Sequence, residues 1–242
     1  STLLTEGIGN NMPLSQRISA AKHAVQTFMH QLHLPDIHHK AALFSHRRDQ
    51  HPELSRSDGF RQSVQGVHSA TVAAQADLQV YFFGHYHVVP NNQCIDKWCS
   101  HKAKLLFAYM LLNRKHVICR DVLMDKFWPN TQASSARDSL NVAIHAIRQA
   151  LLNAGAKHNY LIFKEECYSI NPEALIWIDV EEFMQHWQQS HKGEARINMP
   201  EIIQELESAR RLYTADFMEE DLYDDWASME RENLREMYLA TL

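Results

Sequence analysis

The chain has 242 residues, of which 45% are hydrophobic and 22% are charged, with a net charge of -5. This length suits one large domain or two small ones. The longest apolar run is too short for a membrane-spanning helix, and no basic stretch followed by an apolar segment opens the chain. The low count of 7 Gly and 7 Pro excludes collagen-like and low-complexity proteins.

Four cysteines are too few and too scattered for a disulfide framework, namely Cys94, Cys99, Cys119 and Cys167. Reduced thiols are the ordinary state in the cytosol, so we expect a cytoplasmic protein without contact to a membrane. The chain opens at Ser1 without a methionine and closes at Leu242 inside a helical pattern. We therefore expect it to be part of a longer protein.

Charge is unevenly distributed along the chain. Residues 78–160 hold 10 basic and 4 acidic side chains, a net charge of +6, whereas residues 161–242 hold 7 basic and 19 acidic ones, a net charge of -12. The basic block suits an anionic partner such as nucleic acid, and the acidic block would be repelled by phosphate. Ordinary solvation of charged helix faces explains the same numbers, so charge alone leaves both interpretations open.

The first third of the chain has mixed character. We expect a helix over 16–32, a short buried strand over 40–45, a polar loop over 46–59 and a short helix over 60–67. Small residues over 69–77 indicate a linker, and we place a domain boundary there.

The middle of the chain alternates strands and helices. Apolar residues alternate from Leu78 to Phe83, and strand character resumes after Gly84 and again after a turn at 90–92, which predicts a small antiparallel sheet. Helical periodicity then predicts three helices and a hairpin, over 99–113, 119–127, 134–153, 160–164 and 167–171. A sheet, three helices and a hairpin form the layout of a winged helix. Beyond residue 179, helices are expected over 180–190, 198–212 and 226–241, and such pairs suit a short helical repeat.

The predicted helix over 134–153 has two faces. Its apolar side chains form one stripe, which comprises Ala136, Leu140, Ala143, Ile144, Ile147 and Leu151. A second stripe, turned away from the first, comprises Arg137, Asn141, His145 and Arg148. Arg and Asn can bond base edges in a major groove and can equally hold phosphates, and a solvated face is the plain alternative.

Several segments together resemble a known family. The segments are Leu78-Gln-Val-Tyr-Phe-Phe-Gly84, Lys102-Ala-Lys-Leu-Leu-Phe-Ala-Tyr-Met-Leu-Leu112, Phe127-Trp128-Pro129, Ile147-Arg148-Gln-Ala-Leu151, Ile178-Asp179-Val180 with Phe183, and Tyr213-Thr-Ala-Asp216-Phe217. Their order and spacing are similar to the bacterial transcriptional activators of the Streptomyces antibiotic regulatory protein type. Gln149 stands where that family has a second arginine, and Cys167 where the wing usually has glycine.

The resemblance implies a fold that is mainly α with small β-sheets. Its parts are an N-terminal α/β segment over 1–77, an OmpR-like winged helix-turn-helix over 78–178, and the start of a helical, tetratricopeptide-like activation domain over 179–242. It implies a sequence-specific transcriptional regulator whose third helix enters the major groove of double-stranded DNA. The resemblance also allows for binding to RNA polymerase and for self-association into a homo-oligomer.

The same resemblance assigns candidate DNA-binding residues. The groove face holds Arg137, Asn141, His145 and Arg148, and the wing holds Lys157, His158 and Lys164. Ser134 and Ser135 could donate to a phosphate at the helix N-terminus, while capping of the helix is their plainer role.

Residues 1–77 are faintly similar to part of a von Willebrand factor A domain. Gly7, Gly9 and Asn11 stand where that family holds a metal with Asp, Ser and Ser. A site without a carboxylate or hydroxyls binds a hard cation poorly, so we expect no metal there.

Other chemistry is set aside. Sixteen histidines are present, but their spacing to cysteines does not fit a zinc site, and no phosphate-binding loop or nucleophile motif occurs. We expect no enzyme, no metal and no cofactor. The rival to DNA binding is a winged-helix and tetratricopeptide-like protein-interaction module within a larger signalling protein.

Overall fold

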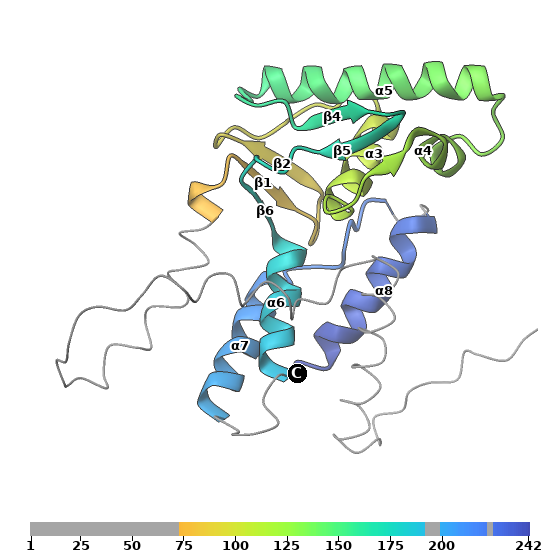
Figure 1. Ribbon diagram of the computed structural model, residues 1–242. Coiled ribbons are helices and arrows are strands. Elements are labelled where there is room, and N and C mark those ends of the chain that lie inside the picture. Colours follow the sequence, from red (N-terminus) through yellow and green to blue (C-terminus); the bar gives the residue numbers. More distant parts are fainter. Residues whose placement is uncertain (1–72, 192–198, 222–224) are drawn as a thin grey trace, which may run out of the picture. The chain divides into compact units, whose positions relative to one another are not determined.

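The computed structural model describes residues 73–191, 199–221 and 225–242 (Figure 1). The elements expected within the first 67 residues, and the similarity to a von Willebrand factor A domain, lie outside this part of the chain. The described residues form two compact units. We call residues 73–81 with 87–178 the winged unit, and residues 82–86 with the described residues from 179 onward the helical unit.

The first sheet of the winged unit has three strands in the order β2-β1-β6. β1 (Leu78–Tyr81) pairs antiparallel with β2 (His87–Pro90), as expected. Its other neighbour is β6 (Ile176–Ile178), which pairs with it in parallel. The prediction that strand structure resumes over 93–95 is wrong, because alternation along a segment does not say which distant segment pairs with it.

Three helices follow close to their expected ranges, namely α3 (His101–Leu112), α4 (Arg120–Phe127) and α5 (Ala133–Asn153). The hydroxyl of Ser100 caps α3 by accepting a hydrogen bond from the backbone N–H of Ala103 at 3.4 Å. Leu106, Leu123 and Leu140 contribute one fully buried side chain from each helix. The three helices therefore share one apolar core.

The second sheet of the winged unit has the order β3-β5-β4 and is antiparallel throughout. β4 (Leu161–Lys164) and β5 (Cys167–Ile170) are the predicted hairpin. β3 (Ile118–Cys119) has only two residues, too few for any periodic pattern to reveal. In Figure 1, α5 runs alongside this hairpin.

The helical unit contains α6 (Asp179–His191), α7 (Met199–Leu212) and α8 (Asp225–Leu239). The ends of all three helices lie within one or two residues of the expected ends. α6 and α7 lie side by side, and the imidazole Nδ1 of His186 is 2.6 Å from a carboxylate oxygen of Glu205. The rings of Tyr213 and Tyr238 stack at 4.2 Å, which joins α8 to the segment after α7.

A short segment between β1 and β2 belongs to the helical unit. Phe82 stacks on Phe217 at 5.3 Å, and Phe83 meets Phe183 edge-on at 5.4 Å. The expected continuation of the strand through Phe82 and Phe83 is wrong, because both rings are buried among aromatic residues of the helical unit. Gly84, with φ of 82°, turns the chain back in a conformation that L side chains rarely adopt.

Asp179 fixes this segment to the start of α6. Its buried carboxylate accepts the backbone N–H groups of Phe82 at 2.8 Å, Phe83 at 2.9 Å and Val180 at 2.7 Å. Burial raises the pKa of Asp179 to about 7, and the backbone hydrogen bonds oppose that rise. Asp179 belongs to one of the segments that carry the family resemblance, and the structure adds what its carboxylate binds.

Candidate nucleic-acid interface

The 21 residues of α5 bury one side of the helix. All six side chains of the predicted apolar stripe are buried, and Ala150 joins them. Burial of one stripe leaves the opposite face of α5 for solvent or a ligand.

The outward face of α5 carries three of the four polar residues predicted for it. Arg137, Asn141 and His145 are exposed. They succeed one another every four residues and so share one side of the helix. Val142 is also 69% exposed on this face, and its place outside the apolar stripe, one residue after Asn141, could have predicted this exposure.

Arg148 differs from the predicted outward stripe. Its side chain is half-buried, and its guanidinium Nη2 donates to the backbone carbonyl of Leu161 in β4 at 3.2 Å. This bond ties α5 to the hairpin. The second stripe of α5 therefore turns from an open surface into a packing contact at its C-terminal end.

Ser134 and Ser135 lie in the first turn of α5 and are exposed. The N-cap residue is Gln132, whose side chain makes no capping bond. The prediction that the two serines cap the helix is therefore wrong, because α5 begins earlier than the sequence indicated. Both residues belong to the N-terminal turn of α5, where the helix dipole favours an anion.

The hairpin of the winged unit closes in a two-residue turn at Glu165 and Glu166. Both residues have positive φ, 51° and 61°, as in a type I′ turn. Lys164 is 3.4 Å from Glu165, and Glu166 pairs with Arg120. The tip of the wing thus presents two acidic residues, each of which has a basic partner.

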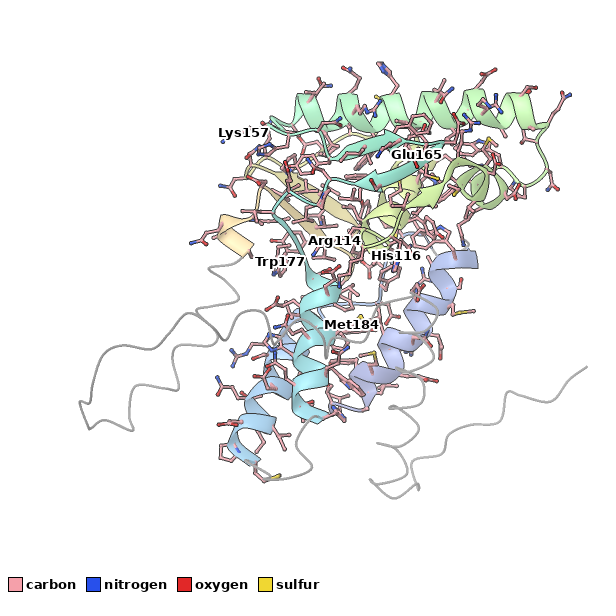
Figure 2. All side chains as sticks on the ribbon, in the orientation of Figure 1. Arg114, His116, Lys157, Glu165, Trp177 and Met184 are labelled. Carbon is pink, nitrogen blue, oxygen red and sulfur yellow. The ribbon has the colours of Figure 1, made fainter. Side chains whose placement is uncertain are left out.

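The other predicted wing residues lie before β4. Lys157 and His158 are exposed, and His158 is 3.8 Å from Asp77. Figure 2 shows Lys157 and Glu165 at opposite ends of β4. The structure thus does not gather Lys157, His158 and Lys164 at one place on the hairpin.

Much of the basic excess in the winged unit is used within the unit. Lys102 donates to the carbonyl of Phe127 at 2.7 Å, and the ammonium of Lys126 lies 4.8 Å from the ring centre of Tyr109. Arg120 and Arg148 have the partners named above. The net charge of residues 78–160 therefore overstates the positive charge that α5 can offer to a ligand.

Among the described residues, no group of three His, Cys, Asp or Glu is arranged to hold a metal ion. Across the same residues, no helix has both the length and the apolar character to cross a membrane.

The described fold is mainly helical with small sheets, in the element order of a winged helix followed by paired helices. A solved structure shares this fold: EmbR from Mycobacterium tuberculosis, determined in complex with a low-affinity phosphopeptide. The similarity has a TM-score of 0.58 at 17% identity and covers 69% of this chain and 44% of EmbR. The chain thus spans less than half of EmbR, and the likeness concerns the fold. No protein-family model and no curated protein matches the chain.

Proposed function

We propose that this chain is a sequence-specific DNA-binding transcriptional regulator and not an enzyme. Its parts are a winged helix over 78–178 and a tetratricopeptide-like helical domain that begins at 179. The observation that carries the proposal is the exposed polar face of α5, on a helix whose opposite face is buried, in a fold shared with EmbR. Such a regulator acts in the cytoplasm.

In this proposal α5 lies in the major groove. Arg137 donates to guanine edges and Asn141 forms paired hydrogen bonds with adenine. His145 reaches a base or a phosphate, and the methyl groups of Val142 meet the methyl group of thymine. Arg148 positions α5 against the hairpin rather than reading bases.

Contacts to the DNA backbone come from the ends of α5 and from the wing. The hydroxyl groups of Ser134 and Ser135 donate hydrogen bonds to a phosphate at the helix N-terminus. Lys157 and Lys164 add cationic contacts, and His158 adds a hydrogen-bonding side chain. Because Glu165 and Glu166 repel phosphate, the wing approaches the duplex through its flank and not through its tip.

The test is selection of bound double-stranded DNA from a random pool by the full chain, followed by affinity measurements at several salt concentrations. We expect enrichment of one motif and a linear fall of log affinity with log salt. Arg137→Ala should weaken binding about 10-fold or more, and Asn141→Ala should relax the preference for adenine. Arg210→Ala removes an exposed charge from α7 and is the matched control.

Failure to enrich any motif, with equal behaviour of Arg137→Ala and Arg210→Ala, would favour the protein-interaction module instead. In that case α5 and the acidic wing tip meet a protein. Binding of RNA polymerase or self-association through the helical unit is compatible with either result.

A further inference from the structure

Two of the four cysteines face each other in the second sheet of the winged unit. Cys119 ends β3 and Cys167 begins β5, and the two residues are direct partners in the antiparallel register. Their sulfur atoms are 2.9 Å apart, joined by a thiol hydrogen bond. In sequence the two residues are 48 positions apart.

The register places this pair where a cross-strand disulfide fits. Cys167 also pairs with Lys164 across the two-residue turn, so its backbone N–H and C=O point toward β4. On the other side, the N–H of Arg120 donates to the carbonyl of Glu166 at 2.9 Å. Since hydrogen-bonded and non-hydrogen-bonded pairs alternate, Cys119 and Cys167 occupy a non-hydrogen-bonded position.

At such a position the Cα atoms lie about 4.5 Å apart, and a disulfide spans Cα separations of about 4.4–6.8 Å. The bond can therefore close without moving either strand. An ion pair next to the cysteines also joins the two segments, because Arg120, directly after β3, pairs with Glu166, directly before β5.

Both sulfur atoms are open to a small oxidant, and the two residues differ in exposure. Cys119 is exposed, whereas Cys167 is half-buried. The hydrogen bond with Cys119, together with partial burial, raises the pKa of Cys167 to about 11. Cys167 therefore stays protonated at neutral pH, and exposure favours Cys119 as the sulfur that meets an oxidant first.

We infer that Cys119 and Cys167 are a redox-active pair, which a peroxide converts into a reversible disulfide. The sulfur of Cys119 attacks one peroxide oxygen, the O–O bond breaks, and a sulfenic acid and one water form. The sulfur of Cys167 then attacks the sulfenic sulfur, its proton leaves with the departing hydroxide as a second water, and the S–S bond forms. Two thiols lose two electrons and hydrogen peroxide gains them, and a dithiol reductant reverses the change.

The disulfide joins functional parts of the winged unit. Cys119 is the N-cap residue of α4, and Cys167 follows the wing turn. The chain between the two sulfurs contains α4, α5 and β4. Oxidation therefore locks the wing to the residue that precedes α4 and closes a loop around α5, whatever ligand α5 binds.

The experiment treats the reduced full chain with hydrogen peroxide, quenches it with a thiol-alkylating reagent and maps peptides by mass spectrometry. We expect one dominant intramolecular product in which Cys119 is linked to Cys167, with Cys94 and Cys99 alkylated. Dithiothreitol should restore four alkylated cysteines. Thermal denaturation should show a higher Tm for the oxidised chain, because the closed loop restricts the unfolded chain.

Variants make the outcome decisive. In Cys167→Ser, dimedone should trap a sulfenic acid at Cys119, and in Cys119→Ser the intramolecular product should disappear. Cys94→Ser and Cys99→Ser remove exposed cysteines elsewhere and should leave the product and its Tm shift unchanged. Linkage through Cys94 or Cys99, or only over-oxidised or intermolecular products in the wild-type chain, overturns the inference, independently of whether the chain binds DNA.

Discussion

The side chains that join α5 and α3 to their neighbours in the winged unit differ in charge and burial from Asp179 of the helical unit. In the winged unit, long cationic side chains reach single carbonyls near the surface, as Arg148 does for Leu161 and Lys102 does for Phe127. In the helical unit, one buried carboxylate receives three backbone N–H groups, two of them from Phe82 and Phe83, nearly a hundred residues earlier.

The two arrangements differ in how much of the stability of a unit depends on one side chain. When a half-exposed cationic side chain is removed, water can solvate the carbonyl that it had bonded. A buried carboxylate that is removed leaves several N–H groups without partners in an apolar environment. Loss of Asp179 should therefore destabilise the helical unit more than loss of Arg148 or Lys102 destabilises the winged unit.

The largest expected effect comes from Asp179→Ala. Since the N–H groups of Phe82, Phe83 and Val180 lose their acceptor, we expect a loss of about 3 kcal/mol or more in the free energy of unfolding. Hydrogen exchange followed by mass spectrometry should show the loss in residues 82–86 and α6, with α5 unchanged.

Two further variants sharpen this prediction. Asp179→Asn keeps one acceptor oxygen, so its free energy of unfolding should fall less than that of Asp179→Ala. Asp138→Ala removes an exposed carboxylate from α5 and should cost less than about 0.5 kcal/mol. Equal exchange profiles for Asp179→Ala and Asp138→Ala would contradict the assigned role of Asp179.

The second effect tests the winged unit. Arg148→Ala removes the bond between α5 and β4, and we expect the free energy of unfolding to fall by about 1–2 kcal/mol, because a charged donor is lost from a half-buried site. Urea denaturation measures this change in the free energy of unfolding. Arg137→Ala, on the exposed face of the same helix, should leave stability unchanged within about 0.5 kcal/mol. If the two variants unfold alike, Arg148 does not join α5 to the hairpin.

Arg148 and Arg137 show the limit of what sequence patterns can predict. The apolar stripe of α5, its length and the hairpin at 161–170 could be predicted, because each follows from local periodicity and turn chemistry. Arg148 could not be separated from Arg137 by spacing, since the strand that accepts its hydrogen bond comes from a later segment. DNA contact by either residue stays a prediction.

The same limit applies at β6 and at Phe82. Ile176–Ile178 has only three residues, and its place beside β1 depends on a parallel pairing across the whole winged unit. Phe82 continues the alternation of β1, yet its ring belongs with Phe217 in the helical unit. Local pattern sets the type of an element, and long-range packing sets where it ends and with what it pairs.

A third effect is a pH dependence confined to the helical unit. Hydrogen bonds to Glu182 and Glu205 raise the pKa of His186 above its ordinary value of 6.5. The folded state then binds the proton more tightly than the unfolded state, so this stabilisation is present below pH 6.5 and is lost as pH rises through the folded pKa. We expect His186→Gln to cost about 1 kcal/mol at pH 6 and clearly less at pH 8.5.

Urea denaturation of wild type and His186→Gln at both pH values measures this difference. Because Asp179 also titrates, only the difference between the two proteins reports on His186. His145→Gln, on the exposed face of α5, is the matched control and should show the same cost at both pH values. A His186→Gln cost that does not change with pH would falsify the ion-pair role.

The smallest expected effect is a gain of stability at the wing turn. Glu165 adopts positive φ, which costs an L residue free energy, and Asn tolerates that conformation better. Its ion pair with Lys164 is largely exposed and contributes little. Glu165→Asn should therefore raise the free energy of unfolding by about 0.5 kcal/mol. Glu173→Asn, at an exposed position where φ is not positive, should produce no gain, and a gain of equal size there would show that charge removal rather than backbone conformation is responsible.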